Sequence, residues 1–152
     1  MRFRQPILAV GTGCYLALVG WLTLGPQPLD STGRGFLHRA IRFISGDNTL
    51  DWITYALVEF VANIVLFVPV GVLFVLMLGW RRWWLAAVLG IALTAAIEFA
   101  QVFLPNRVTD PRDVISNSVG AVIGVALVLT VTAWRQSRSV KKADADERAL
   151  VG

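Results

Sequence analysis

The sequence has few of the residues on which the chemistry of soluble enzymes most often depends. It contains one cysteine, Cys14, and one histidine, His38. A single cysteine excludes an internal disulfide framework and a cysteine-rich zinc site, and a single histidine excludes chemistry that needs two imidazoles. Charged residues make up only 16% of the chain, against roughly 25% in soluble domains. Disorder is excluded too, because a disordered chain combines low hydrophobicity with many charges.

Apolar residues dominate the 152-residue chain. They account for 56% of it, and the mean hydropathy is +0.64. A helix that crosses a bilayer needs about 20 apolar residues to span about 30 Å of hydrocarbon. Four stretches meet this requirement, at residues 7–25, 53–80, 83–104 and 114–134. Backbone polar groups in lipid must be satisfied within their own segment, so the predicted fold class is all-α, a polytopic transmembrane helix bundle.

The distribution of Lys and Arg predicts how the bundle is oriented. With four spans both termini lie on one side, which carries nine of these residues, whereas the other side carries five. The positive-inside rule therefore places both termini in the cytoplasm. The net charge of +4 is interpreted as marking span ends, and nucleic acid is not expected as a partner. The nine are Arg2, Arg4, Arg81, Arg82, Arg135, Arg138, Lys141, Lys142 and Arg148, and the five are Arg34, Arg39, Arg42, Arg107 and Arg112.

Two segments outside the spans have patterns of their own. Residues 36–44 place apolar side chains on one helical face and His38, Arg39 and Arg42 on the other. This predicts an amphipathic helix on the outer leaflet, with a short helix that caps the bundle as the alternative. Residues 135–152 are basic first and then acidic. They predict a flexible cytoplasmic tail whose basic part touches anionic lipid, which leaves residues 1–134 as the membrane domain.

The polar residues of the last three spans share one depth in the predicted topology. Ionisable residues in a membrane cost about 2.5–3.5 kcal/mol each on insertion scales, so their positions are informative. Here they lie in the outer halves of these spans or in the loop before the fourth span, and the inner halves are almost wholly apolar. We therefore predict an outward-facing polar pocket that binds a ligand. Its candidate residues are Glu59, Asn63, Glu98, Gln101, Arg107, Asp110, Arg112, Asp113 and Asn117.

Residue spacing supports a convergence of helix faces. Glu59 and Asn63 are four residues apart, and Glu98 is four residues after Thr94, so each pair shares a face. Asp113, Asn117, Gly120 and Gly124 follow the same kind of spacing in the fourth span. Gly120 and Gly124 form a G-x-x-x-G pattern, which lets another helix approach closely. In the second span Pro69 removes a backbone hydrogen bond and predicts a kink.

The side chains of this pocket suit several kinds of chemistry. Arg107 and Arg112 offer forked donors for phosphate or carboxylate. No cofactor is predicted, although Glu98, Asp110 and Asp113 offer the hard oxygen ligands that a divalent cation needs. The expected partners are membrane lipids, a cell-wall precursor or a lipoglycopeptide. The oligomeric state is left open.

Two alternatives to a binding pocket remain. In the first, the polar set only fixes helix packing, with Glu98 paired to Arg107 or Arg112 and Asp113 capping its helix. In the second, the protein is an intramembrane enzyme acting on a lipid-linked phosphate, with Glu98 as the candidate catalytic residue, either as general base or as metal ligand. The sequence contains no G-x-S-x-G, H-E-x-x-H or P-loop motif.

Four short motifs occur in a recognisable order. They read N-I-V-L-F-V-P-V-G at residues 63–71, I-E-F-A-Q at 97–101, R-V-T-D-P-R-D at 107–113 and N-S-V-G at 117–120. Together they resemble the VanZ-like family, the family of the teicoplanin-resistance protein VanZ. Pro69 and Gly71 are motif positions of that family. Thr94 stands where the family usually has a small hydroxyl residue, and Arg112 is not a motif position.

The resemblance implies an integral protein of the bacterial cytoplasmic membrane. The namesake of the family lowers sensitivity to glycopeptide antibiotics, which act on cell-wall precursors outside the membrane. The implied ligand is thus an anionic envelope lipid, a cell-wall precursor or a lipoglycopeptide, and the implied role is a contribution to glycopeptide resistance. No catalytic mechanism accompanies the family.

Overall fold

The structure is a computed structural model that describes the backbone of residues 4–25, 51–104 and 110–151. These residues form helices and no strand, which confirms the all-α prediction. The elements are α1 (Arg4–Leu24), α3 (Asp51–Leu78), the short 3₁₀ helix η1 (Trp80–Arg82), α4 (Trp83–Gln101) and α5 (Pro111–Val151). The amphipathic helix predicted at residues 36–44 and the side chain of Arg107 lie outside the described residues.

Each of the four α-helices contributes a segment long and apolar enough to cross a membrane. The segments are Gln5–Leu24, Ala56–Leu78, Trp80–Gln101 and Pro111–Lys142. Large apolar side chains such as Ile7, Val65 and Leu127 remain exposed on the outside of the bundle. In a bilayer these side chains would face acyl chains, which are as apolar as they are. The structure thus agrees with the predicted multi-pass bundle of four spans.

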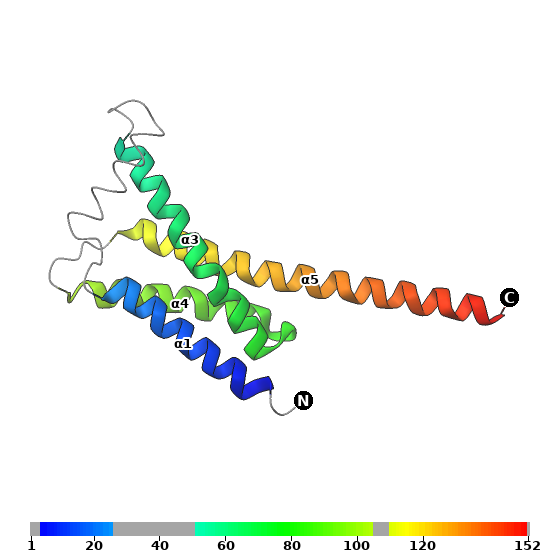
Figure 1. The fold of residues 1–152 in the computed structure, drawn as a ribbon. Helices are drawn as coiled ribbons and strands as arrows, with labels where there is room; N and C mark the ends of the chain where they lie inside the picture. Colours follow the sequence, from blue (N-terminus) through cyan, green and yellow to red (C-terminus); the bar gives the residue numbers. More distant parts are fainter. Residues whose placement is uncertain (1–3, 26–50, 105–109, 152) are drawn as a thin grey trace.

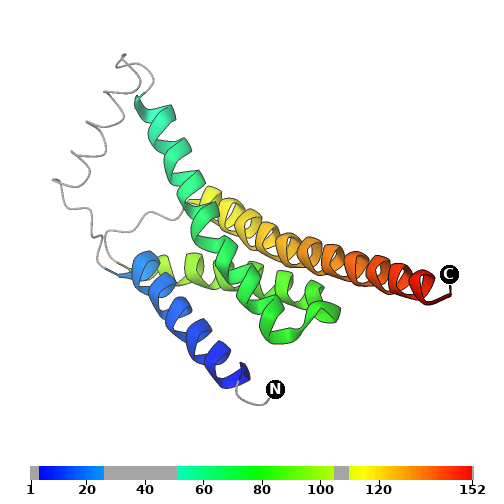
Figure 2. The same cartoon turned by 45° about the vertical axis from the view of Figure 1, so that its right-hand side comes forward.

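Helix α3 crosses α5 and also packs against α1 and α4, and α4 packs against α5 as well (Figures 1 and 2). One buried apolar cluster joins Val19 of α1, Phe67 and Val70 of α3, and Ile97 of α4. A second cluster joins Val75, Ala86 and Val125 of α3, α4 and α5. Pro69 lies between Phe67 and Val70 in sequence, and α3 continues through it to Leu78.

Glycines allow the backbones of α3 and α5 to approach closely. A β-carbon on Gly120 would overlap the carbonyl oxygen of Ile64, and one on Gly124 would overlap that of Val68. In the other direction, a β-carbon on Gly71 would overlap the carbonyl oxygen of Ala121. The predicted G-x-x-x-G surface is therefore occupied by α3, and a third glycine completes the contact from the opposite helix.

Helix α5 starts earlier and ends later than the predicted fourth span, which was placed at residues 114–134. It begins at Pro111. Proline is favoured at the first position of a helix because it has no amide hydrogen to leave unpaired. It continues to Val151, so the segment predicted as a tail is helical and extends beyond the bundle (Figures 1 and 2). Residues 135–151 contain no Gly or Pro and several strong helix formers, which is consistent with this extension.

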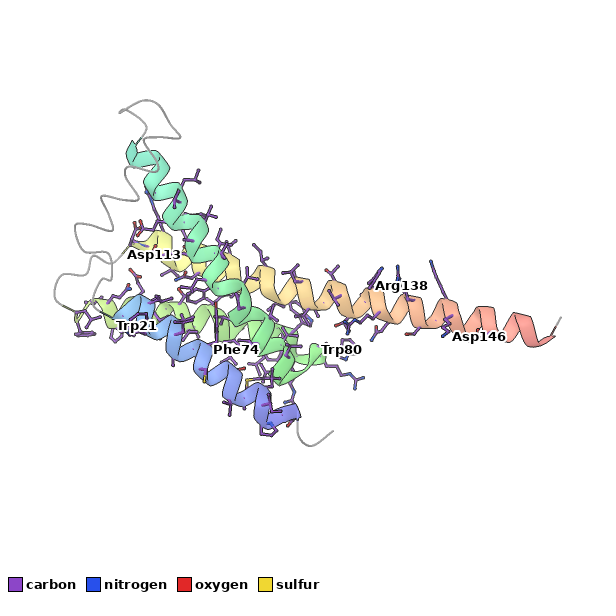
Figure 3. The ribbon with its side chains drawn as sticks, in the orientation of Figure 1. Trp21, Phe74, Trp80, Asp113, Arg138 and Asp146 are labelled. Atoms are coloured by element: carbon purple, nitrogen blue, oxygen red, sulfur yellow. The ribbon has the colours of Figure 1, made fainter. Side chains whose placement is uncertain are left out.

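The two ends of the bundle differ in their side chains. Trp80 lies at the end opposite Asp113, and Arg138 and Asp146 lie farther along α5 (Figure 3). Trp80 begins η1, and Trp83 and Trp84 follow η1 directly. All three are exposed, as is Trp134. The guanidinium carbon of Arg138 lies 3.9 Å from the centroid of the Trp134 ring. Exposed tryptophans beside arginines are typical of a membrane interface.

Candidate functional site

The polar residues of three helices meet at the end of the bundle marked by Asp113 (Figure 3). The last turns of α4 and the first turns of α5 lie at this end, beside the first half of α3. Two layers of polar contacts can be distinguished along the bundle axis. The inner layer joins α4 to α5, and the outer layer joins α3 to α5.

The inner layer is a buried hydrogen bond between two helices. The Asn117 amide nitrogen donates to the hydroxyl oxygen of Thr94 at 3.0 Å. Asn117 is 4% exposed and Thr94 is 1% exposed. The neighbouring Ser116 is also fully buried, and its hydroxyl donates to the backbone carbonyl of Asp113 at 3.1 Å. Both ends of the Asn117–Thr94 bond are therefore shielded from the outside of the bundle.

The outer layer contains more carboxylates than amides. Asn63 on α3 donates from its amide nitrogen to the Asp113 carboxylate at 2.8 Å. Glu98 of α4 is half-buried, whereas Glu59, one turn before Asn63, is exposed. Both glutamates interact electrostatically with Asp113 and Asp110. Four acidic side chains from three helices thus share one region.

Asp110, rather than Asp113, caps the start of α5. Its carboxylate accepts a hydrogen bond of 2.9 Å from the backbone N–H of Arg112, and its backbone carbonyl accepts one of 2.8 Å from the N–H of Asp113. This is the usual geometry of an N-cap residue. The alternative in which Asp113 is the cap is therefore wrong, because the helix starts before it. The Asp113 side chain is instead turned toward Asn63 of α3.

Gln101 connects α4 to α1 through a hydrogen bond. Its side-chain nitrogen donates to the backbone carbonyl of Thr23 at 2.9 Å, and the Gln101 side chain is buried. A second polar contact to α1 comes from the Tyr15 hydroxyl, which donates to the carbonyl of Leu66 on α3 at 2.8 Å. Sequence reasoning did not identify Tyr15. The available signal was a hydroxyl inside an apolar span, since a buried Tyr usually finds a partner for its O–H.

Two buried oxygens in this region have no donor among the described residues. They are Oε1 of Glu98 and Oδ1 of Asn117. Buried polar atoms in proteins are nearly always hydrogen-bonded, so an unpaired one needs an explanation. Because both atoms accept and neither donates, the missing group is a hydrogen-bond donor or a cation.

Arg112 is the remaining candidate residue in the described part of the chain. Arg112 is exposed on the first turn of α5, where its guanidinium is open to a ligand or to water. In the part of the chain that the structure describes, no three His, Cys, Asp or Glu side chains are arranged to hold a metal ion.

The sequence was compared with models of known protein families. A model of the VanZ/LLP1 family matches residues 12–133. The matched region runs from α1 into α5 and includes every candidate site residue. No curated protein and no solved structure matches the chain.

Proposed function

The chain belongs to the VanZ/LLP1 family, and we propose that it is a bacterial cytoplasmic-membrane protein that binds the charged end of an envelope molecule or lipoglycopeptide. The candidates are an anionic envelope lipid, a lipid-linked cell-wall precursor and a lipoglycopeptide. The ligand would occupy the polar end of the bundle, which faces outward if both termini lie in the cytoplasm. The positive charge near the termini supports that orientation.

One observation carries this proposal, which is the convergence of polar side chains from α3, α4 and α5 at a single end. Asn63 contacts Asp113, and Asn117 contacts Thr94, so the convergence consists of direct contacts between helices. Polar groups in a membrane are costly to keep. A helix bundle that needed them only for packing would gain little from leaving the Glu98 and Asn117 oxygens without donors.

The phosphate or carboxylate of such a ligand would be recognised by arginine. Arg112 is exposed beside the carboxylate cluster, and Arg107 precedes α5 by a few residues in the sequence. A guanidinium binds phosphate through parallel hydrogen bonds, which provides both charge and orientation. The carboxylates beside these arginines would disfavour a ligand that places negative charge against them, because like charges at close range are unfavourable.

Lipid profiling of the purified full-length protein tests the proposal. The protein is extracted in a mild detergent, and co-purified lipids are identified by native mass spectrometry. We expect Arg107→Ala and Arg112→Ala to reduce the bound ligand without reducing the yield of folded protein. The matched control is Arg81→Ala, which removes an exposed arginine at the opposite end. The proposal fails if no bound molecule is lost in the first two variants and retained in the control.

A link to antibiotic sensitivity follows from the family. We propose that occupancy of this site by a cell-wall precursor or a lipoglycopeptide lowers sensitivity to teicoplanin. Expression of the chain in a susceptible bacterium is then expected to raise the teicoplanin concentration needed to stop growth. Expression of Arg107→Ala at the same level should leave sensitivity unchanged. Equal sensitivity with and without the intact protein would contradict the link.

A further inference from the structure

The two unpaired oxygens belong to the two polar layers, with Glu98 Oε1 in the outer layer and Asn117 Oδ1 in the inner layer. Asn117 uses its amide nitrogen to bind Thr94, which leaves Oδ1 as the unpaired atom. Glu98 follows Thr94 by four residues on α4 and therefore occupies the same face one turn farther out. Helical side chains lean toward the N-terminus of their helix, so the Glu98 side chain can cover the turn of α4 that carries Thr94.

The backbone of Asp110 hydrogen-bonds to the Glu98 carboxylate, and the other described groups around the two oxygens are mostly acceptors or already paired. Asn63 already donates to Asp113. Asp110 accepts from the backbone of Arg112, and Glu98 and Glu59 both interact electrostatically with Asp110 and Asp113. The described part of the cluster is therefore acidic and rich in acceptors. A group that carries positive charge and several hydrogens on one small atom would complement it.

We propose that the ligand of this site carries a primary ammonium group, which donates hydrogen bonds to Oε1 of Glu98 and Oδ1 of Asn117. An ammonium offers three donors and no acceptor, so it can satisfy both oxygens at once. A hydroxyl offers only one donor, and a quaternary ammonium offers none. The inference rests on the proposed lipid-binding function and deepens it by naming the chemistry of the head group.

The ligand class is consequently an aminophospholipid, with a phosphate and a primary amine in one head group. Arg112 lies exposed at the start of α5, and Asn117 lies between one and two turns farther into the same helix. A phosphate near Arg112 would thus lie closer to the end of the bundle than an amine near Asn117. This arrangement also explains why an acidic cluster is found where a phosphate-bearing ligand is expected.

Native mass spectrometry of the full-length protein with defined lipids tests the inference. The protein is delipidated and titrated with phosphatidylethanolamine, phosphatidylcholine or phosphatidylglycerol of identical acyl chains. Phosphatidylcholine keeps the positive charge but has no N–H group, so it separates hydrogen bonding from charge. We expect phosphatidylethanolamine to bind about tenfold or more tightly than the other two, as the loss of charged hydrogen bonds predicts. Free ethanolamine is added as a competitor, to separate a lipid from a soluble amine.

Two variants assign the preference to this site. Glu98→Gln keeps the size of the side chain and supplies a donor that can satisfy Asn117, so the fold should be retained and the preference lost. Asp146→Asn makes the same chemical change on the exposed extension of α5 and should keep the preference. Thermal unfolding of both variants confirms that they are folded.

Each outcome has a definite consequence. A preference for phosphatidylethanolamine that Glu98→Gln abolishes supports the inference. Competition by free ethanolamine as strong as that of the lipid would overturn the lipid assignment. Equal binding of all three lipids, or a preference that survives Glu98→Gln, would overturn the ammonium inference while the proposed lipid binding stands. Equal binding is also expected if the Asn117 amide is reversed and donates to Glu98, because neither oxygen would then lack a partner. Binding of none of the three lipids, together with no lipid sensitive to Arg112→Ala, would instead refute the proposed function.

Discussion

Asn117 of α5 and Thr94 of α4 form a hydrogen bond that is buried between two membrane-spanning helices, with a distance of 3.0 Å between the amide nitrogen and the hydroxyl oxygen. The bond ties α4 to α5 one layer below the carboxylate cluster. It therefore fixes the face of α4 that carries Glu98 relative to the face of α5 that carries Asp113.

Loss of the Thr94 hydroxyl is expected to destabilise the bundle. Thr94→Val keeps the shape of the side chain but leaves the Asn117 amide without its acceptor. We expect a loss of about 0.5–2 kcal/mol, the range for hydrogen bonds between membrane helices and for buried unpaired groups. Thr94→Ser keeps the hydroxyl and should lose less. Unfolding in mixed micelles measures both, and equal stability of the valine variant and the unmodified protein would contradict the contact.

Substitution of Gly124 should disrupt the contact between α3 and α5. A β-carbon there would overlap the Val68 carbonyl, so Gly124→Ala forces the helices apart at a cost of about 1–3 kcal/mol. Gly13→Ala is the matched control, because no atom lies within 4 Å of a β-carbon at that position. In the control, alanine should be neutral or stabilising by up to about 1 kcal/mol through helix propensity. Thermal unfolding distinguishes the two, and similar behaviour of both variants would count against the close crossing.

Tyr15 should help to hold α1 against the bundle. Tyr15→Phe removes the hydroxyl that donates to the carbonyl of Leu66, and we expect a loss of about 0.5–1.5 kcal/mol. Trp21→Phe changes an exposed aromatic residue on the same helix and should have little effect. Protease sensitivity and thermal unfolding provide the measurements. A Tyr15→Phe variant as stable as the Trp21→Phe variant would show that the contact does not contribute.

The orientation of the chain can be tested with thiol labelling in whole cells. Cys14 is the only native cysteine, and Cys14→Ser removes it. In this background we expect Thr109→Cys, between α4 and α5, to react with a membrane-impermeant thiol reagent. Ser139→Cys, on the exposed extension of α5, should react only after the cells are opened. The reverse pattern would place the polar end in the cytoplasm.

Hydropathy alone predicted the four spans, because apolar length is a direct requirement of the bilayer. The helical spacing of Asp113, Asn117, Gly120 and Gly124 also predicted that they share one face, and the last three of these residues are buried. Spacing within a helix does not reveal which helix packs against that face. That Gly120 meets Ile64, and that Asn63 meets Asp113, depends on how α3 crosses α5, and this crossing is a property of the tertiary structure.

Other features were missed because their sequence signals are weak or act in opposite directions. The carbonyl of Thr23 is a backbone group that every residue has, so the residue type at this position could not predict its contact with Gln101. The charges of residues 135–151 suggested a flexible tail, although the same residues have high helix propensity. Asp110 and Pro111 together form a cap followed by a favoured first helical residue. This pair is the sequence signal for the observed start of α5 at Pro111.

The central claim is that polar side chains from separate helices meet at one end of the bundle, and cross-linking between Asn63 and Asp113 tests it most directly. In a Cys14→Ser background, Asn63→Cys and Asp113→Cys are combined and treated with a short bifunctional thiol reagent in native membranes. Cross-linked peptides are then identified by mass spectrometry. We expect an efficient cross-link for this pair and little for Val61→Cys with Asp113→Cys, because Val61 is exposed two residues away. No cross-link for the first pair, or an equal yield for both, would contradict the account.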